Sequence, residues 1–377
     1  MAPFSVAFIL LLSLTPICIW VIASRESDRK ERPKRWILYS SLGPFYRLTA
    51  VALWSAAWEV GRSTDLNGAA PWLGRIISSR TMPSFWVVPI LGLIIYFALF
   101  LFVSRRLLNE YWSTWGSVRL VWWRLVALGL PLLMVARGFD ALVSGQLIGI
   151  LWLGFSGITA RVGGGLLRLA EGMKLHVAKT GETRNRAFAI ARKMEVKIGR
   201  VFIVPEGKGH MTNAFASPYA VGVTDNLGKY LTRSQIDYVL AHEVAHAKKK
   251  HGRKIMLMTV GIYSLLAAVL FLGRGSIGDI RPLAVVVAIF GPVMVMNYLS
   301  CRHEYESDRA AVDFTHDPET AICALVRLYR ATMAPINCSL FTQMFLSHPS
   351  LTRRVMAIAQ AGQIPIERVN GILRKHG

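Results

Sequence analysis

Hydrophobic residues along this chain are gathered into long runs, which are separated by short and mostly basic polar segments. A run of about 20 apolar residues is long enough for a helix to cross the hydrocarbon core of a bilayer. Four runs come close to that length without an internal charge: Phe4–Ser24, Pro83–Val103, Ile255–Gly273 and Leu283–Leu299. The pattern therefore predicts a membrane protein with several transmembrane helices.

Two further apolar segments are less regular. Trp36–Trp58 is interrupted by a proline and an arginine, and Leu125–Ala160 is broken by Arg137 and Asp140. The second of these could form two short spans or a re-entrant pair. The last two uninterrupted runs could instead be buried core helices. At 19 and 17 residues without a charge, however, they favour a hairpin through the membrane.

Between these runs, the periodicity predicts helices and a small sheet. Leu166–Lys193 is typical of an amphipathic helix, and Thr232–Gln235 has the pattern of a capping box that begins another helix. Val201–Val204 is a short β-type run, and Met211–Val223 favours an extended backbone. Asp317–Glu319 is typical of a helix start, because it has proline in the first turn. We therefore expect a mainly α protein with a small sheet beside a helical domain.

Charge narrows the possible partners. The chain has 44 lysine and arginine residues against 22 aspartate and glutamate residues, a formal net charge of +22. No nucleic-acid-binding module is recognisable, and the basic clusters adjoin hydrophobic runs, so we expect a lipid bilayer and no nucleic acid as partner. Six basic residues between positions 25 and 35 favour a retained anchor with its N-terminus outside. Lys248–Lys254 and Arg302 predict that the flanks of the last hairpin are cytoplasmic.

The strongest chemical signal is the sequence HEVAH at His242–His246, in the helix that the capping box predicts. Residues four apart in a helix share one face, so both imidazoles can bind one metal ion. A catalytic zinc has three protein ligands and one position for water, whose proton Glu243 can take. The alternative is a surface helix with two solvated histidines. It is less favoured because the neighbouring residues are apolar.

A third ligand is expected in another predicted helix, over Ser300–Ala311. Glu304 and Asp308 share one face of this helix. One carboxylate could bind zinc while the other accepts the free ring N–H of a ligand histidine. Glu306 points elsewhere and is expected to be a solvated charge. On this segment alone, an ordinary charged helix face with neighbouring arginines as partners is the better interpretation.

Taken in order, these motifs resemble the HtpX-like membrane zinc metalloproteases, which are relatives of the CAAX prenyl proteases and the Oma-type mitochondrial proteases. The resemblance covers about residues 165–360 and is specific for the HEVAH helix and for Glu304 with Asp308. Family members usually have Ser-Arg before the glutamate and Ala before the aspartate, where this chain has Ser-Cys and Ser. These departures leave every expected zinc ligand in place. Further matching stretches are Asn213–Ala216, His251 and His348–Arg354.

The resemblance implies one Zn²⁺ per chain, held by His242, His246 and Glu304, with Asp308 in contact with a ligand histidine. Zinc would lower the pKa of a bound water and polarise the scissile carbonyl. Glu243 would take the proton of the attacking water and deliver it to the leaving nitrogen.

Three more residues gain a role from the resemblance. Asn213 would lie on a strand along the cleft and hold the backbone of the substrate, and His348 and Arg354 would face the site and stabilise the oxyanion. The alternatives are that Asn213 is a turn residue, that His348 and the proline after it cap a helix, and that Arg354 pairs with a carboxylate.

Together these inferences predict a multi-span membrane region at 1–160 and the first part of a zincin-like α+β catalytic domain at 161–254. A transmembrane hairpin at 255–299 and the second part of the catalytic domain at 300–377 follow. The hairpin would return the chain to the same side, so that both ligand helices meet. We expect a zinc endopeptidase of misfolded or membrane proteins in a bacterial inner membrane, with its catalytic domain on the cytoplasmic side. The alternatives are a multi-span transport protein and an inactive zinc-binding scaffold.

Overall fold

The computed structural model divides the chain into two compact units. One comprises Met1–Glu171 with Ile262–Pro292, and the other comprises Gly172–Gly261 with Val293–Gly377. The residues that the structure describes are 130–157, 159, 176–204, 214–217, 219–275, 281–332, 336–344 and 346–376. Predictions that fall outside the described residues are the spans Phe4–Ser24, Trp36–Trp58 and Pro83–Val103, and the site residue Asn213.

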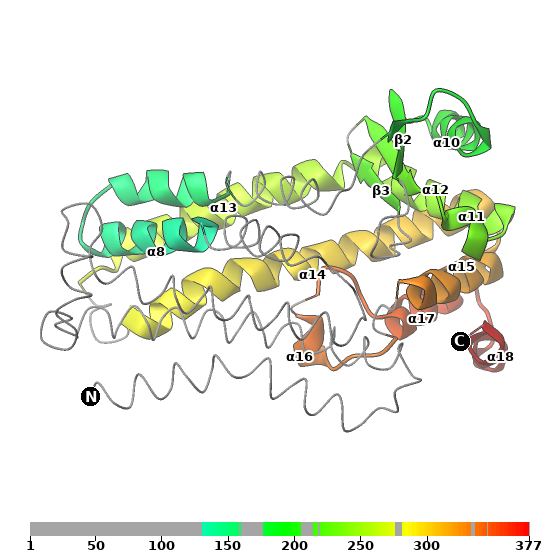
Figure 1. The fold of residues 1–377 in the computed structure, drawn as a ribbon. Coiled ribbons are helices and arrows are strands. Elements are labelled where there is room, and N and C mark those ends of the chain that lie inside the picture. The colour runs from blue at the N-terminus through cyan, green and yellow to red at the C-terminus, as the bar shows by residue number, and fades with distance from the viewer. Residues whose placement is uncertain are drawn as a thin grey trace, which may run out of the picture. The chain divides into compact units, whose positions relative to one another are not determined.

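The second unit contains a small four-stranded sheet in the order β1-β2-β4-β3 (Figure 1). β2 and β4 are parallel, and the other two pairings are antiparallel. The strand predicted at Val201–Val204 is confirmed as β2, and the extended segment predicted at Met211–Val223 contains β3 and most of β4. The strands are β1 His176–Val177, β2 Arg200–Val204, β3 Ala214–Ser217 and β4 Ala220–Thr224.

The helix predicted over Leu166–Lys193 is shorter than expected. α10 Glu182–Lys193 is helical, but His176–Val177 before it form β1. Gly181 precedes α10 with φ at 121°, a conformation that glycine adopts far more readily than other residues. The prediction was wrong over 176–181 because local periodicity does not reveal that β1 pairs with the more distant β2.

α12 Arg233–Lys248 is the central helix of the second unit, and it packs against β3, α10 and α15. The predicted capping box is present: the Thr232 side chain accepts from the backbone N–H of Gln235, and the Gln235 side chain accepts from that of Thr232. A solvated helix face is excluded, because the middle of α12 is completely buried at Leu240, Ala241, Val244 and Ala245.

Shorter helices complete this unit (Figure 1). α15 begins after its N-cap Asp317, as predicted, and packs against α17 and α18. The apolar sides of α15 and α17 belong to the same buried core as α12 and the sheet. The helices are α11 Leu227–Tyr230, α15 Pro318–Ala331, α16 Leu340–Gln343, α17 Leu351–Ala361 and α18 Ile366–His376.

Two long helices, α13 His251–Leu272 and α14 Arg281–Thr315, have residues in both units. Among the described residues, α13 is the one helix that is long and apolar enough to cross a membrane. α14 is continuous over 35 residues. It therefore joins the predicted span Leu283–Leu299 and the helix predicted over Ser300–Ala311 into one element. The change from apolar to charged residues near Ser300 contains no helix breaker, and Pro292 is accommodated inside α14.

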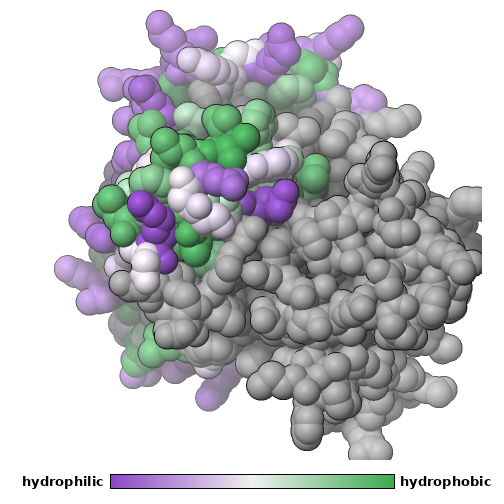
Figure 2. Space-filling model, turned by 90° about the vertical axis from the view of Figure 1, so that its left-hand side faces the viewer, coloured by the Kyte–Doolittle hydropathy of each residue, from purple (hydrophilic) through white to green (hydrophobic). Residues whose placement is uncertain are grey.

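In the first unit, α8 Leu130–Val143 is followed by a short apolar helix at Ile148–Gly157. Gly138 and Gly149 allow a close approach, because a Cβ atom on Gly138 would lie 2.9 Å from the carbonyl oxygen of Gly149. The interrupted apolar segment of the sequence is therefore a pair of short helices in its described part. Figure 2 shows hydrophobic residues gathered on one face with hydrophilic side chains beside them. Exposed apolar residues at these helices include Leu147, Ile150, Leu151 and Phe155.

Candidate metal centre

Three side chains that were predicted as metal ligands meet in the second unit. α12 supplies His242 and His246, one turn apart, and α14 supplies Glu304. Nε2 of His242 lies 3.1 Å from Nε2 of His246. The carboxylate oxygens of Glu304 lie 3.5 Å from Nε2 of His242 and 3.4 Å from Nε2 of His246. Two imidazoles that are four residues apart on α12 and one carboxylate from α14 thus converge on one point.

These separations fit a zinc ion. With bonds of about 2.0–2.2 Å to nitrogen and oxygen, tetrahedral zinc ligands lie about 3.4 Å apart. The distance between the two nitrogens is close to that value, and so is the distance from each nitrogen to one of the two Glu304 oxygens. One ligand atom from each residue gives a set within 4.8 Å. Two imidazoles and one carboxylate are common zinc ligands, and a set of three leaves a position for water or substrate.

The charges around the three ligands also fit a cation. Glu243, Glu304 and Asp308 are buried, and the buried guanidinium of Arg354 lies beside the last two. With His242 neutral, as metal binding requires, three ionised carboxylates and one guanidinium leave two negative charges uncompensated. Buried charges are costly unless they are paired or bind a metal. A divalent cation would balance this cluster.

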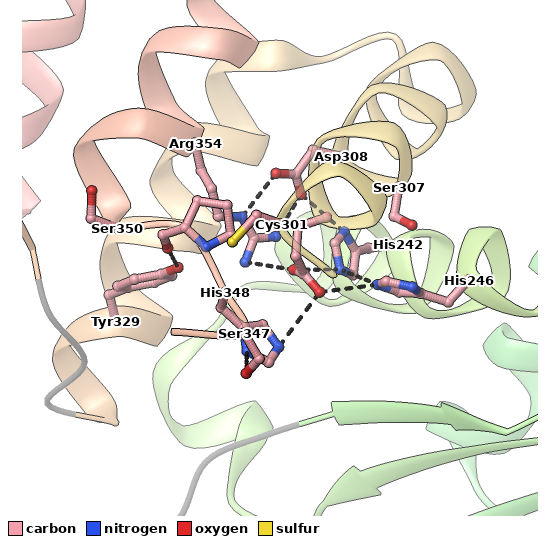
Figure 3. Close-up of polar contacts among 12 residues, drawn as sticks. His242, His246, Cys301, Ser307, Asp308, Tyr329, Ser347, His348, Ser350 and Arg354 are labelled. Carbon is pink, nitrogen blue, oxygen red and sulfur yellow. Dashed lines mark hydrogen bonds and ion pairs between the residues drawn. The ribbon is translucent and has the colours of Figure 1, made fainter. Parts of the chain in front are cut away.

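The first ligand histidine is supported by a buried carboxylate. Nδ1 of His242 lies 2.9 Å from Asp308, a short charge contact whose N–H direction is not that of a regular hydrogen bond. Asp308 accepts a hydrogen bond of 2.7 Å from the hydroxyl of Tyr238. It also accepts two, of 2.8 and 2.6 Å, from Arg354 (Figure 3). Arg354 also lies 3.2 Å from Glu304. One guanidinium therefore holds both the ligand carboxylate and the carboxylate behind His242.

This environment shifts the pKa values of the buried groups. Burial opposes ionisation of Asp308 and Glu304, but the charge of Arg354 and the contacts with the ligand histidines together outweigh it and lower the pKa of both carboxyl groups. Burial also opposes protonation of His242, yet contacts with Asp308 and Glu304 raise its pKa to about 10. Because a metal binds the neutral imidazole, metal binding at His242 competes with this proton. Burial raises the pKa of Glu243, which suits a group that takes and returns a proton.

The second ligand histidine has a different support. Nδ1 of His246 lies 3.0 Å from Nδ1 of His251, the first residue of α13. Nε2 of His251 lies 3.3 Å from Glu306, and its ring stacks on that of His303 with 4.0 Å between centroids. The Glu306 side chain is 43% exposed, so the expectation of a solvated charge holds for its exposure but not for its contacts.

A loop between α16 and α17 brings His348 to the ligand carboxylate (Figure 3). Nε2 of His348 lies 3.5 Å from Glu304, and its side chain is 64% exposed. The side chain of Gln343 holds this loop: it donates to the carbonyl of His348 at 3.1 Å and accepts from the N–H of Ser350 at 3.0 Å. His348 is therefore fixed through its backbone while its ring stays accessible.

The described part of the structure brings together all the predicted site residues except Asn213, which lies outside it. Arg354 faces two carboxylates, which is the contact that the alternative interpretation expected for it. The residues that are brought together are His242, Glu243, His246, Glu304, Asp308, His348 and Arg354.

Sequence reasoning missed several contacts of the site. Tyr238 was given no special role, although it lies four residues before His242 and therefore on the same helix face. Gln343 and His303 carried no recognisable signal. Their contacts depend on how a loop and two helices meet, and the spacing of residues does not encode this.

Residues 178–361 match the model of Peptidase family M48. This segment, called the M48 segment below, is similar to that family. The M48 segment contains all the predicted site residues, and the resemblance inferred from the motifs is confirmed.

Two relatives illustrate the likeness. The Protease HtpX homolog of Ralstonia pickettii (strain 12J) is 27% identical over 239 residues, which cover 53% of this chain and 82% of the relative. That of Polynucleobacter necessarius subsp. necessarius (strain STIR1) is 28% identical over 221 residues, or 47% of this chain and 75% of the relative. The crystal structure of S. mikatae Ste24p is 14% identical, with a TM-score of 0.49 over 95% of this chain and 97% of that one.

Proposed function

We propose that this protein is a membrane zinc endopeptidase with one zinc ion per chain. His242, His246 and Glu304 would be the ligands, and Glu243 the general base. The observation that carries the proposal is two imidazoles and one carboxylate whose ligand atoms all lie within 4.8 Å of one another, beside a buried glutamate and within an M48 segment. The name of the relatives, Protease HtpX homolog, fits the same reaction class.

Each residue then has a chemical task. A bound zinc ion supplies Lewis-acid polarisation of the scissile carbonyl and lowers the pKa of water. Glu243 takes a proton from the attacking water and delivers it to the leaving nitrogen. His348 is exposed beside Glu304, so its ring can donate an N–H to the developing oxyanion. Arg354 is occupied by Asp308 and Glu304, and we therefore assign it to positioning the ligand carboxylate rather than to contact with substrate.

The substrate would bind as an extended peptide. Among the described strands, β3 lies at the edge of the sheet, and it packs against α12, which carries the two histidines. An edge strand has unpaired backbone groups that can pair with a peptide strand. Asn213 directly precedes β3 in the sequence, and we assign it to the backbone of that peptide.

A lipid bilayer is the second partner. α13 begins directly after the metal-binding helix, and only 11% of its most apolar 18-residue stretch is buried. Exposed apolar surface of this extent fits contact with lipid. The flanking basic residues support a cytoplasmic position for the metal site, and we propose that the membrane is a bacterial inner membrane. Misfolded or membrane proteins are the substrate class that this location favours.

Cleavage of an unfolded reporter protein tests the proposal. The detergent-purified chain with zinc should cleave it, and Glu243→Gln should keep the metal but lose cleavage. Glu319→Gln makes the same chemical change at an exposed glutamate of α15 and should cleave like the wild type. Equal cleavage by wild type and Glu243→Gln would contradict the assigned base. A wild type that binds zinc without cleaving would favour the inactive scaffold.

A further inference from the structure

We infer that His251 and Glu306 form a positioning relay that fixes the ring of His246 for metal binding. This inference rests on the proposed metal centre and gives a role to two residues that have none in it. The relay consists of two contacts. Nδ1 of His246 lies 3.0 Å from Nδ1 of His251, and Nε2 of His251 lies 3.3 Å from Oε2 of Glu306.

The direction of the hydrogen bonds follows from the metal-facing atom. Nε2 of His246 is the nitrogen that points at Glu304 and His242, and a nitrogen that binds a metal carries no proton. The proton of His246 must therefore lie on Nδ1, which donates to Nδ1 of His251. His251 in turn must carry its proton on Nε2, which donates to Glu306. A single carboxylate thereby selects the tautomer of both rings.

The backbone places His251 for this task. α12 ends at Lys248, and Lys250 has φ at 53°, in the left-handed region that few residues other than glycine adopt. This tight turn brings the first residue of α13 back against the last turn of α12. A backbone conformation that costs energy persists only where the surrounding structure requires it.

The neighbours of His251 hold its ring in one orientation. The ring is 2% exposed and lies parallel to that of His303, with 6° between the planes. The hydroxyl of Ser307 lies 3.5 Å from Nδ1 of His251. Lys249 donates to the carbonyl of Glu306 at 3.3 Å, which ties the acidic end of the relay to the end of α12. Packing alone would need neither ring nitrogen of His251 at hydrogen-bond distance.

Zinc affinity, measured by competition with a chromophoric chelator, tests the relay independently of cleavage. His251→Phe keeps a ring for the stack on His303 but removes both nitrogens. We expect it to weaken zinc binding by about 10- to 100-fold, the usual effect of losing a partner of a ligand histidine. Glu306→Gln should weaken binding less, and it also serves if His251→Phe does not fold, because Glu306 is half-exposed. His176→Phe, the same exchange at an exposed position of β1, should bind like the wild type.

The visible spectrum of the Co²⁺-loaded protein adds a readout of ligand geometry. The relay predicts a changed spectrum for His251→Phe and an unchanged one for His176→Phe. Wild-type zinc affinity and an unchanged cobalt spectrum in both His251→Phe and Glu306→Gln would overturn the relay. If the wild type binds zinc but does not cleave, the endopeptidase proposal fails, while weakened binding in His251→Phe still supports the relay. If the wild type binds no zinc, both fail.

Discussion

The two ligand histidines of α12 lie one turn apart, but the structure supports them in different ways. Behind His242 stands Asp308, which is buried and receives three hydrogen bonds from Tyr238 and Arg354. Behind His246 stands another histidine, His251, and the charge at the end of that side belongs to a half-exposed glutamate. One side is therefore closed and charged, and the other reaches solvent within two residues.

Because of this difference, we expect one side to control the stability of the fold and the other to control metal binding. A buried ion pair costs desolvation energy and tolerates the loss of a partner badly, so the Asp308 side is tied to the stability of the fold. A half-exposed carboxylate is already solvated and loses little when it is neutralised. The His251 side should therefore affect metal binding more than folding.

The largest expected effect is on the closed side. Arg354→Met would leave Asp308 and Glu304 without their guanidinium, and we expect a loss of about 3–5 kcal/mol in the free energy of unfolding. Denaturant unfolding in detergent measures it. Arg368→Met is the matched control, because Arg368 holds Glu319 with the same two-pronged geometry, at 2.9 and 2.8 Å, on the surface. Similar losses in the two variants would show that burial does not distinguish them.

Removal of the metal should come next in size. A ligand that binds only the folded state at 100 times its dissociation constant stabilises it by about 2.7 kcal/mol. We therefore expect zinc to raise the melting temperature of the chelator-treated protein. The same zinc addition should have no effect on His246→Ala. An equal rise in that variant would mean that zinc binds elsewhere.

Removing one hydroxyl group on each side compares the two sides by a smaller effect on stability. Tyr238→Phe removes the hydroxyl that donates to Asp308 and keeps the packing of the ring, so about 1.5–3 kcal/mol of stability should be lost. Ser307→Ala removes a hydroxyl at 3.5 Å from His251, where the contact is long and the expected loss is small. Thermal unfolding compares the two variants. A larger loss in Ser307→Ala would reverse the assignment of the closed side.

The smallest expected difference between the two sides is in how zinc binding responds to salt. Exposed charges are screened by salt, and buried ones much less. The weakening of zinc binding in Glu306→Gln should therefore shrink as ionic strength rises. The weakening of zinc binding in Asp308→Asn should not change with ionic strength. Chelator competition at low and high salt measures both, and a salt-independent effect of Glu306→Gln would place that carboxylate with the buried groups.

Local chemistry made much of this site predictable. The capping box, the HEVAH spacing and the shared face of Glu304 and Asp308 are properties of single helices, and helix geometry converts them directly into positions. The helix start at Asp317 was predictable for the same reason.

What the sequence could not predict depends on contacts between elements. β1 was assigned to a helix because its pairing with β2 is not visible in local periodicity. The relay depends on the left-handed backbone at Lys250, a residue type that gives no warning of it. For Arg354 the sequence left two interpretations open, an oxyanion donor or the partner of a carboxylate, and only the way α17 meets α14 shows its contact with two buried carboxylates.

X-ray absorption of the zinc-loaded protein at the zinc edge tests the metal centre most directly, because it reports the atoms around the ion. The account predicts one zinc per chain with two imidazole nitrogens and carboxylate or water oxygen at about 2.0–2.2 Å. The His242→Ala and His246→Ala variants should each lose the ion. A sulfur neighbour at about 2.3 Å, or the same zinc spectrum in both variants, would contradict the assignment of His242, His246 and Glu304.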